Sequence, residues 1–401
     1  MWPVTPLLSI DDALACVLAR ARPLPSERVP LVRAAGRVLA EDVAAAVDLP
    51  PFPSSAMDGY ALRAGDTPGR LPVVFRIAAG VPAGRPLAQG EAMAISTGGA
   101  VPEGADAVAQ IEIVTEEDGT LHVPDPIAPG TNVRPRGGDV RAGEVVLGAG
   151  TRLTAAQVGA LAATGAAEAV VGRRPRVVVL GTGTELRAPG EALGPGQIYE
   201  SNGAMLQAAF EAAGAEVERM GPVEDDEAAH RSALERGLDA DVLVSSGGVS
   251  VGPHDLVRRI LGELGVQEEF WGVSVRPGKP LAFGTRGSTL VFGLPGNPVS
   301  ALVSTELFVR PALLALQGAA EPGPLYRSAR MVVPIRRNRM RDELARARTR
   351  AGDDGVVVEP LPGQESHMIV RSASADALVL VPAGDGELAA GELVRYLPLS
   401  G

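Results

Sequence analysis

The chain has little of the chemistry that disulfides and zinc sites need. A single cysteine, Cys16, excludes a disulfide framework, and the helical pattern around it predicts a buried structural thiol. No Cys-x-x-Cys pair occurs, and the four histidines lie far apart in the sequence. A zinc site is therefore not expected. Aromatic residues make up only 3% of the chain, so leucine, valine and alanine must fill its cores.

The sequence also lacks a secretory signal and an apolar run of about 18 residues. These absences predict a soluble cytoplasmic protein with no membrane partner. The formal net charge of −11 argues against nucleic acid as a partner. An acidic chain repels an anionic substrate at long range, but salt screens that repulsion beyond about 8 Å. Helix N-termini and a few fixed cations can then hold an anion locally.

Length and composition predict several packed domains. The chain has 401 residues, 46% of them hydrophobic, and one domain typically holds about 100–200 residues. The 49 glycines and 34 prolines follow no collagen-like period and predict many short turns. We expect a helical or extended domain from residues 1–47 and 146–172, a small β domain over 48–145, an α/β domain over 173–322 and a C-terminal β domain over 323–401.

Apolar spacing predicts helices in the first part of the chain. Residues 9–20 have helical spacing behind Ser9, with an acid three residues on, as in a capping box. A second helical pattern covers residues 31–43, and a third covers 154–165 and ends on Gly165. In the last part, alternating apolar residues predict short strands at 355–360, 367–371, 377–382 and 392–397.

From residue 175 the sequence alternates strands with helices. The run RVVVLG at 176–181 is apolar throughout, as a strand buried on both faces should be. A late helix has Asn297 at its N-cap and Pro298 at its first position, and Pro311 should end or kink it. The expected fold is multidomain α/β and β: a doubly wound parallel α/β domain flanked by a helical linker region, a small β domain and a C-terminal β-barrel-like domain.

Two glycine-rich turns in this α/β part carry the strongest functional signal. They lie in DVLVSSGGVSVGPHD at 241–255 and LVFGLPGNPVSALVSTELF at 290–308. In each, a short apolar strand leads through a turn of Gly, Ser, Asn or Pro into a helix. Such a turn presents unpaired N–H groups and a helix N-terminus at the end of a strand, where an anion can bind. Two such turns predict a substrate that carries phosphate or another oxyanion.

Two further motifs match nucleotide sites incompletely. GTGTELR at 181–187 begins like a dinucleotide fingerprint, but Leu186 stands where the third glycine should be. RPGKP at 276–280 contains Gly-Lys, but Pro280 replaces the serine or threonine of a P-loop. A nicotinamide site and a P-loop are therefore the less favoured alternatives.

A third motif resembles the nucleophile elbow of serine hydrolases. GVSVG at 248–252 has the G-x-S-x-G pattern, which would make Ser250 a nucleophile. Two glycines separate this serine from its strand, whereas the elbow serine lies directly between strand and helix. Only His367, in another predicted domain, is left to complete a triad. A serine hydrolase thus stays open as a minor alternative.

Acidic residues follow three strands of the predicted sheet: Glu185 the first, Asp225 the second and Asp255 the third. The carboxyl ends of parallel strands meet at one edge, so these carboxylates should converge and favour Mg²⁺-assisted chemistry on a phosphate or oxyanion. Asp225 or Asp226 can instead cap a helix, and Asp255 lies in a first helical turn, where the dipole favours an acid.

Two more positions combine charge with a rigid turn. Arg276 and Lys279 are flanked by prolines, which argues against the alternative of a mobile, solvated surface pair. Prolines and small residues in PPFPSSAMDGYALR expose Asp58, although a structural turn capped by this aspartate is the simpler reading.

These motifs together resemble one protein family. PSSAMDGYA, STGGAVPEGADAV, NVRPRGGDV, TGTEL, SSGGVSVGPHD, VRPGKPLAFG and GLPGNPVSA occur in the order found in the molybdopterin molybdenumtransferases, known as MoeA in bacteria and as the E domain of gephyrin in animals. The resemblance implies an elongated four-domain homodimer and the last step of molybdenum cofactor assembly. Molybdate would be inserted into adenylylated molybdopterin, with Mg²⁺-dependent release of AMP.

The resemblance also implies a site between the α/β domain of one subunit and the β domain of the other. Asp58 and Thr97 would come from the second subunit. The catalytic residues of the first would be Glu185, Asp225, Asp255, Arg276 and Lys279, with Glu185 and Asp255 holding the metal. The substrate would be bound by Ser246, Gly247, Gly248, Ser250, Pro295, Gly296, Asn297, Pro298 and, from the C-terminal domain, Ser366.

Three positions depart from the family's pattern and bear on the molybdate contacts: Thr184, Gly272 and Arg276. The protein partners that the resemblance implies are a molybdopterin adenylyltransferase and apo-molybdoenzymes. Two alternatives remain, a non-catalytic molybdopterin carrier or scaffold and the adenylyltransferase itself. The intact acidic set argues against the first, and the two flanking β domains argue against the second.

Overall fold

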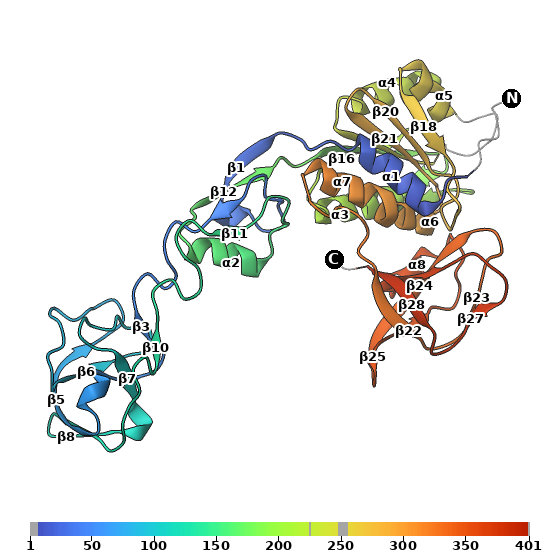
Figure 1. Cartoon of the computed structure of the whole chain (residues 1–401). Helices are drawn as coiled ribbons and strands as arrows, with labels where there is room; N and C mark the ends of the chain where they lie inside the picture. The colour runs from blue at the N-terminus through green and yellow to red at the C-terminus, as the bar shows by residue number, and fades with distance from the viewer. Residues whose placement is uncertain (1–6, 224–225, 248–255, 400–401) are drawn as a thin grey trace.

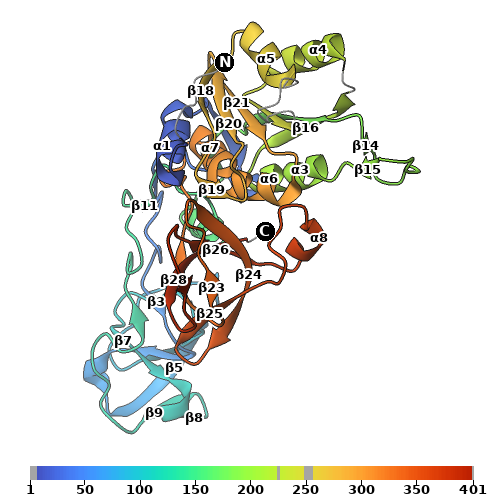
Figure 2. The same cartoon turned by 90° about the vertical axis from the view of Figure 1, so that its right-hand side faces the viewer.

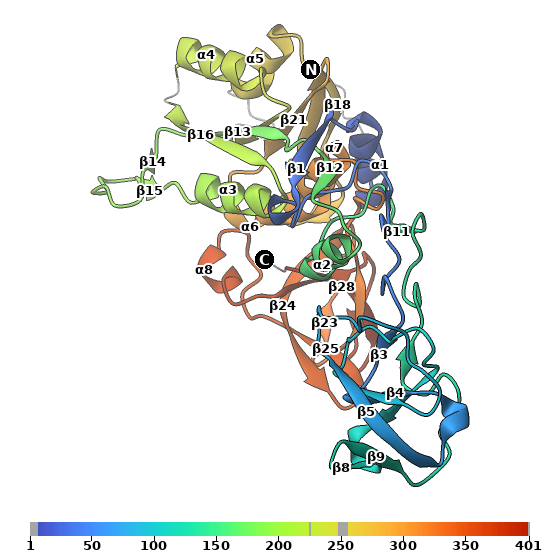
Figure 3. The same cartoon turned by 90° about the vertical axis from the view of Figure 1, so that its left-hand side faces the viewer.

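The structure is a computed structural model that describes residues 7–223, 226–247 and 256–399. Figure 1 shows an elongated molecule with a small β part at one end and a part around helix α2 (Ala155–Ala163) in the middle. An α/β part and a β-barrel lie together at the other end, and the turned views in Figures 2 and 3 show the barrel beside the same helices. The predicted multidomain α/β and β fold is confirmed.

The α/β part is built on one mixed sheet in the order β16-β13-β17-β21-β20-β18. The four strands β16, β13, β17 and β21 are parallel, and a hairpin adds an antiparallel edge. Since β13 lies between β16 and β17, the strand order reverses there, which places the ligand crevice at the carboxyl ends of β13 and β17. The strands are β13 (Arg176–Thr182), β16 (Glu216–Val223), β17 (Val242–Ser246), β18 (Gln267–Trp271), β20 (Ala282–Arg286) and β21 (Thr289–Leu294).

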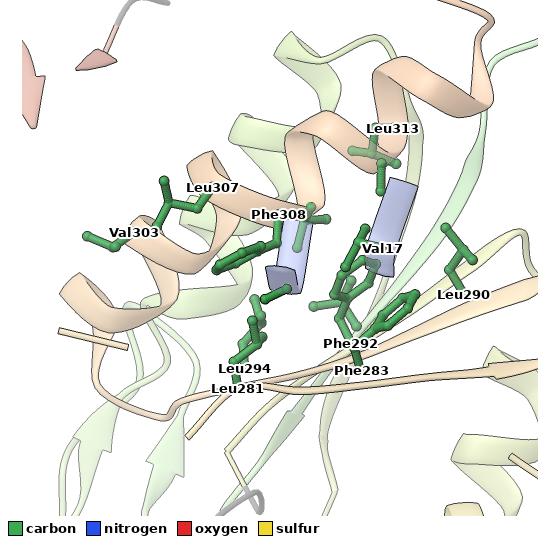
Figure 4. Close-up of a cluster of buried hydrophobic side chains, with 14 of the residues drawn as sticks. Val17, Leu281, Phe283, Leu290, Phe292, Leu294, Val303, Leu307, Phe308 and Leu313 are labelled. Atoms are coloured by element: carbon green, nitrogen blue, oxygen red, sulfur yellow. The ribbon is translucent and has the colours of Figure 1, made fainter. Parts of the chain in front are cut away.

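Helices cover both faces of this sheet and enclose its core. Figure 4 shows Phe283 and Phe292 of the sheet packed beside Val17 and Phe308 of the covering helices. The predicted N-cap is confirmed, because the Ser9 side chain accepts a hydrogen bond from the Asp12 amide. One face carries α1 (Ile10–Arg20), α3 (Asn202–Ala212), α6 (Pro298–Ser304), η4 (Thr305–Val309) and α7 (Arg310–Leu316), and the other carries α4 (Glu227–Gly237) and α5 (Leu256–Glu263).

The helix that begins at Pro298 does not end at Pro311, although an end there is one of the two outcomes predicted for this proline; the other, a kink, stays a prediction. A proline has no N–H to donate within a helix. Here the segment η4 is a π-turn, in which the Arg310 amide donates to the Thr305 carbonyl five residues back. The wider turn lets the helix pass through the proline and continue to Leu316.

The same helix corrects the expectation that the chain has no long apolar run. Residues Pro298–Leu316 are long and apolar enough to cross a membrane, with a mean hydropathy of 1.5, and they form the one such helix in the described ranges. However, 83% of that window is buried inside the molecule. A core helix of this kind passes the same test, and its apolar side chains are accounted for by packing on the sheet.

Glu306, in the π-turn, should make stability depend on pH. Its side chain is buried, with Oε2 3.1 Å from Arg310 Nε. Burial raises the pKa of this carboxyl, and the Arg310 charge opposes the shift. A raised pKa in the folded state means that the stabilisation is present at low pH and is lost as pH rises through the folded value.

We therefore expect the stability of the Glu306→Gln variant to increase relative to that of the wild type as pH rises. The difference in melting temperature, variant minus wild type, should increase by about 2 °C between pH 5 and pH 8. Scanning calorimetry at both values measures this, with the exposed Glu235→Gln as control. A difference that stays constant or decreases would mean that the pair with Arg310 outweighs the burial of the carboxylate.

The C-terminal part is a closed β-barrel. Its strands pair in the order β24-β25-β22-β28-β26, and β26 pairs back with β24. The short strand β19 (Val275–Arg276) of the α/β part pairs with β24 and so joins the RPGKP segment to the barrel. The barrel strands are β22 (Arg327–Met331), β24 (Asp342–Gly352), β25 (Gly355–Pro360), β26 (Ala377–Val381) and β28 (Leu393–Pro398).

Two local predictions in the flanking parts are wrong. Residues 31–43 do not form a helix: only a 3-10 turn, η1 (Leu31–Arg33), forms, and Gly36 then adopts φ +78°, which is outside the helical region. The apolar spacing there reflects burial of an extended segment against β12 (Glu168–Gly172). The strand expected at 367–371 is instead the short helix α8 (Ile369–Ser372).

The remaining elements agree with the predictions made from the sequence. Helix α2 forms as expected, with Gly165 at φ +95° after its end, and β1 (Ser26–Pro30) pairs with β12. The small β part contains a sheet in the order β7-β4-β6-β5-β9-β8. Its strands are β4 (Gly59–Leu62), β5 (Gly69–Ile77), β6 (Ala92–Ile95), β7 (Ala107–Gln110), β8 (Thr115–Glu117) and β9 (Thr120–Val123).

Candidate active site

Asn202 ties the two glycine-rich turns together at the carboxyl ends of β13 and β17. Its Nδ2 donates 2.8 Å hydrogen bonds to Ser246 Oγ and to the Gly296 carbonyl. Its Oδ1 is buried and has no hydrogen-bond partner in the described part of the chain. A buried acceptor without a partner is costly, and this oxygen lacks a donor or cation among the described residues at the carboxyl ends of the strands.

Gly247 lets the two turns pack backbone against backbone. Its φ is +97°, and a Cβ there would lie 2.9 Å from Thr182 Oγ1. The Gly247 amide donates to the Leu294 carbonyl at 3.1 Å. A Cβ on Gly296 would lie only 3.7 Å from the Cα of Gly247. The structure thus brings Ser246 and Gly247 of the first turn to Gly296 of the second, as the strand order requires.

Glu185 lies at the expected edge of the sheet. It follows β13, its side chain is exposed, and its carboxylate lies over Gly183, where a Cβ would be 2.4 Å from Oε2. Glu200, which the sequence analysis missed, is buried at the same strand end beside Gly181. Its carboxylate is already used, because it accepts from the Gly203 amide at 2.6 Å and pairs with Arg219 at 3.1 Å. An acid just before a helix start was the available signal.

A pocket of about 470 Å³ lies where the α/β part meets the barrel. The barrel loop is docked there, because the Val299 amide at the start of α6 donates to the Ser366 carbonyl at 3.1 Å. Five predicted residues, Arg276, Lys279, Pro295, Asn297 and Ser366, line the pocket together with Pro277, Gly278, Pro280, Ser300, Arg341, Gln364, Glu365 and His367. Pro298 lies at the first position of α6 beside it.

The lining of this junction pocket is rich in cations. Arg341 joins Arg276 and Lys279, and one acid, Glu365, is also present. Behind them Glu343 is buried, with Oε2 3.4 Å from Arg276 Nη1. Burial raises the pKa of the Glu343 carboxyl, opposed by the two arginines. Arginine side chains held in place by such partners can bind a tetrahedral oxyanion.

Lys279 is the only lysine in the sequence, and arginine provides every other basic side chain apart from histidine. Its backbone is held at the carbonyl, which accepts from the Val273 and Leu281 amides at 3.0 and 2.9 Å. Its side chain is exposed, and the described residues give its ammonium no ion pair. An ammonium is a compact point charge with three donors, unlike the planar arginine fork.

Arg346 shapes the barrel loop that carries Ser366. Its guanidinium is almost fully buried on β24 and donates to the carbonyls of Gly363 (2.7 Å), Glu365 (3.2 Å) and Met368 (2.8 Å) and to Ser372 Oγ (2.8 Å). Burial lowers the pKa of this guanidinium. The sequence offered no signal for it, since Arg346 is one of several arginines in an alternating strand.

Arg346→Met should therefore loosen the loop. It removes the side-chain donors of the partly buried Gly363 and Glu365 carbonyls and one of the two side-chain donors of the Met368 carbonyl, which costs about 2–4 kcal/mol of stability. We expect trypsin to cut after the exposed Arg371 markedly faster than in the wild type, as measured by mass spectrometry of timed digests. Arg350→Met, an exposed change on the same strand, is the control. Equal cleavage in all three proteins would show that Arg346 does not hold the loop.

Asp58 and Thr97 come together in the small β part. Asp58 Oδ1 accepts a 2.7 Å hydrogen bond from the Thr97 amide, and both residues are exposed. The next residue, Gly59, lets β4 approach β7 closely, since a Cβ there would lie 2.0 Å from the Ala109 carbonyl. In one chain this pair lies at the opposite end of the molecule from the α/β sheet (Figure 1).

Several predicted residues lie outside the described residues: Asp225, Gly248, Ser250 and Asp255. The convergence of three carboxylates and the nucleophile-elbow alternative therefore stay predictions. The helix-cap alternative holds for Asp226, whose carboxylate accepts from the Ala229 amide at 2.8 Å. Among the described side chains, no group of three His, Cys, Asp or Glu is placed to hold a metal.

Comparisons with known proteins place this geometry in a family. Three family models match: the MoeA N-terminal region (domain I and II) over residues 8–165, a probable molybdopterin binding domain over 178–315, and the MoeA C-terminal region (domain IV) over 328–399. The molybdopterin molybdenumtransferase 2 of Mycobacterium tuberculosis is 40% identical over 385 residues, which cover 93% of this chain and 95% of the relative.

Two other proteins are similar to this chain over almost its whole length. The molybdopterin molybdenumtransferase of Haemophilus influenzae is 35% identical and covers 98% of this chain and 99% of its own. The crystal structure of the molybdopterin biosynthesis moeA protein from Pyrococcus horikoshii OT3 has a TM-score of 0.85 at 31% identity, over 98% of this chain and all of the other. The resemblance noted from the motifs is thereby confirmed, and the chain belongs to the MoeA family of molybdopterin molybdenumtransferases.

Proposed function

We propose that this chain inserts molybdate into adenylylated molybdopterin and releases AMP. The chain belongs to molybdenum cofactor biosynthesis, with molybdopterin and molybdate as substrates. The observation that carries the proposal is the cation-rich junction pocket, which shares the turn at Pro295 and Asn297 with the crevice beside Ser246. One substrate that spans the crevice and the pocket would bring its phosphates and its dithiolene to adjoining sites.

The junction pocket is assigned to molybdate. Lys279, Arg276 and Arg341 supply positive charge, and the hydroxyls of Ser366 and Ser300 are suited to the oxygen atoms of a tetrahedral anion. Donors held in place before the reaction stabilise charge that develops during it. Gly278, which is buried against Ser304, keeps the RPGKP turn close to α6.

The crevice at β13 and β17 is assigned to the phosphates. Ser246, Gly247 and Gly296 form its described walls, and Pro298 begins the helix that points its N-terminus there. The sequence expectations for Gly248, Ser250, Asp225 and Asp255 belong to the same proposal. Glu185 and Asp255 would hold Mg²⁺.

The oxygen donors present suit that metal. Mg²⁺ usually takes one or two carboxylates and completes its shell with water and substrate phosphates, so a preformed cluster of three acids is not required. The exposed Glu185 carboxylate and the unpartnered Asn202 Oδ1 are hard oxygen ligands at the same strand ends. When bound, the metal would offset the charge of the phosphates, while the residues of the chain orient the substrate.

The second half of the site is assigned to a second subunit. Asp58 and Thr97 would complete the site of the partner in a homodimer whose four domains follow the expected boundaries. An adenylyltransferase and apo-molybdoenzymes remain the proposed protein partners, and the cytoplasm the proposed location. No observation favours the two alternative functions, a non-catalytic molybdopterin carrier or scaffold and the adenylyltransferase.

The proposal predicts that AMP release requires molybdate. Purified chain, Mg²⁺ and adenylylated molybdopterin should release AMP at a rate that rises with molybdate and saturates, as measured by chromatography of the nucleotide. Sulfate, a smaller oxyanion that thiolates do not coordinate, is the control and should not replace molybdate. AMP release at the same rate with sulfate or without either anion would contradict the proposed reaction.

A further inference from the structure

A second cavity lies on the opposite face of the α/β sheet from helices α3 and α6. It encloses about 230 Å³ between α5 and the strands β18, β20 and β21. Its lining is mostly apolar, with Val257 and Leu261 of α5 on one side and Val291 of β21 on the other. The proposed reaction uses none of these side chains.

The cavity exists because small residues face α5 on this side of the sheet. Leu243 and Val291 point into the core beneath α4 and α5. One pleat further along each strand, the residues on the same face are Ser245 and Gly293, and β20 adds Ala282 and Gly284. The neighbouring strand keeps position 284 small, since a Cβ on Gly284 would lie 2.7 Å from the Gln267 carbonyl. The hollow is therefore a consequence of side-chain choice in ordered strands.

Ser245 places one polar atom on this apolar wall. The residue is 1% exposed, and its Oγ has no hydrogen-bond partner in the described part of the chain. Its strand neighbours Val244 and Ser246 point to the other face. A buried hydroxyl without a partner costs free energy, and a ligand that offers one hydrogen-bonding group would satisfy it.

The charged groups at the edge of the cavity neutralise each other. Arg258 donates through Nε and Nη2 to the two carboxylate oxygens of Glu268, and its guanidinium lies 5.7 Å from the centre of the Trp271 ring. This pair leaves no net charge among the described lining residues, so the cavity suits an uncharged molecule. A cavity of about 150 Å³ holds one benzene ring, and the larger volume here fits two fused rings.

We propose that this cavity binds a neutral bicyclic aromatic molecule through one hydroxyl or N–H group. The rings lie between α5 and the glycines of β20 and β21, and the polar group hydrogen-bonds with Ser245 Oγ. The site is separate from the junction pocket and does not depend on the proposed reaction.

The test is a titration of the full chain with 2-naphthol, followed by its change in fluorescence. We expect a dissociation constant on the order of 0.1 mM. Ser245→Ala should weaken binding about 3- to 10-fold, the value of one neutral hydrogen bond, without lowering the melting temperature, because it removes an unpaired hydroxyl. Ala282→Leu should abolish binding by filling the cavity, whereas the same change at the exposed Ala228 should not.

A charged probe completes the test. 2-Naphthalenesulfonate has the same rings but carries an anion that cannot be buried without a partner, so it should not bind. Absence of 2-naphthol binding to the wild type would overturn the proposal. Binding that Ser245→Ala and Ala282→Leu both leave unchanged would equally overturn it, because the molecule would then occupy another surface.

Discussion

Lys279→Ala should lower kcat/KM for molybdate-dependent AMP release by about 100- to 1,000-fold, the usual loss when one fixed charged donor is removed from a reacting oxyanion. The structure holds the carbonyl of Lys279 with two backbone hydrogen bonds and leaves its side chain exposed at a pocket that two arginines also line. A flexible surface lysine would have no such anchoring. The loss should be largest in the dependence on molybdate concentration, because the ammonium is assigned to that substrate.

Lys279→Arg is the matched variant, since it keeps the charge and changes its shape. A planar fork does not present three donors from one point, so we expect an intermediate activity. The change should not affect folding, because the side chain is exposed, and equal melting temperatures would verify this. If Lys279→Ala had the same kcat/KM as the wild type, Lys279 would not be part of the active site.

A mixture of two inactive variants, Asp58→Ala and Lys279→Ala, should recover about a quarter of the wild-type activity. Each variant alone should be inactive, because each removes one half of a site shared between subunits. After random exchange about half of the dimers are mixed, and each mixed dimer has one intact site of two. The distance between the small β part and the α/β sheet within one chain motivates this expectation (Figure 1).

The exchange experiment separates a shared site from one completed within a chain. Subunits are mixed under mild denaturant, refolded and assayed for AMP release, and the double variant Asp58→Ala/Lys279→Ala mixed with wild type gives the reference for dilution. Light scattering reports the dimer. No recovery in a preparation with verified mixed dimers would mean that Asp58 acts in the same chain or outside the site.

The glycine-rich turns were predictable because their signal is local. Strand, turn and helix follow one another in the sequence, and parallel strands end at one edge, so Ser246, Gly247 and Gly296 could be placed together before the structure was known. Arg276 and Lys279 were singled out by their charge in a proline-flanked turn and Ser366 by the resemblance, and the structure brings all three to one pocket. Their meeting depends on the pairing of β19 with β24, which joins two domains and has no local signal.

Other residues could not be predicted, because their partners are distant in the sequence. Arg346 is indistinguishable from its arginine neighbours until the loop at 363–368 folds over it. The failed helix at 31–43 shows the converse: the apolar spacing was present, but one glycine in the left-handed region redirected the chain. Proline lacks the N–H that a helix needs, so an end or a kink at Pro311 was a sound expectation. The π-turn just before it lets the helix continue.

The central claim is that the junction pocket binds an oxyanion at Lys279, and the chain's single lysine makes it directly testable. The rate of acetylation of Lys279 by an amine-reactive ester can be measured by peptide mass spectrometry, with the N-terminal amine of the same molecule as internal control. Molybdate should slow the reaction at Lys279 in a saturable way and leave the N-terminus unaffected. An unchanged rate at Lys279 in excess molybdate would contradict the account.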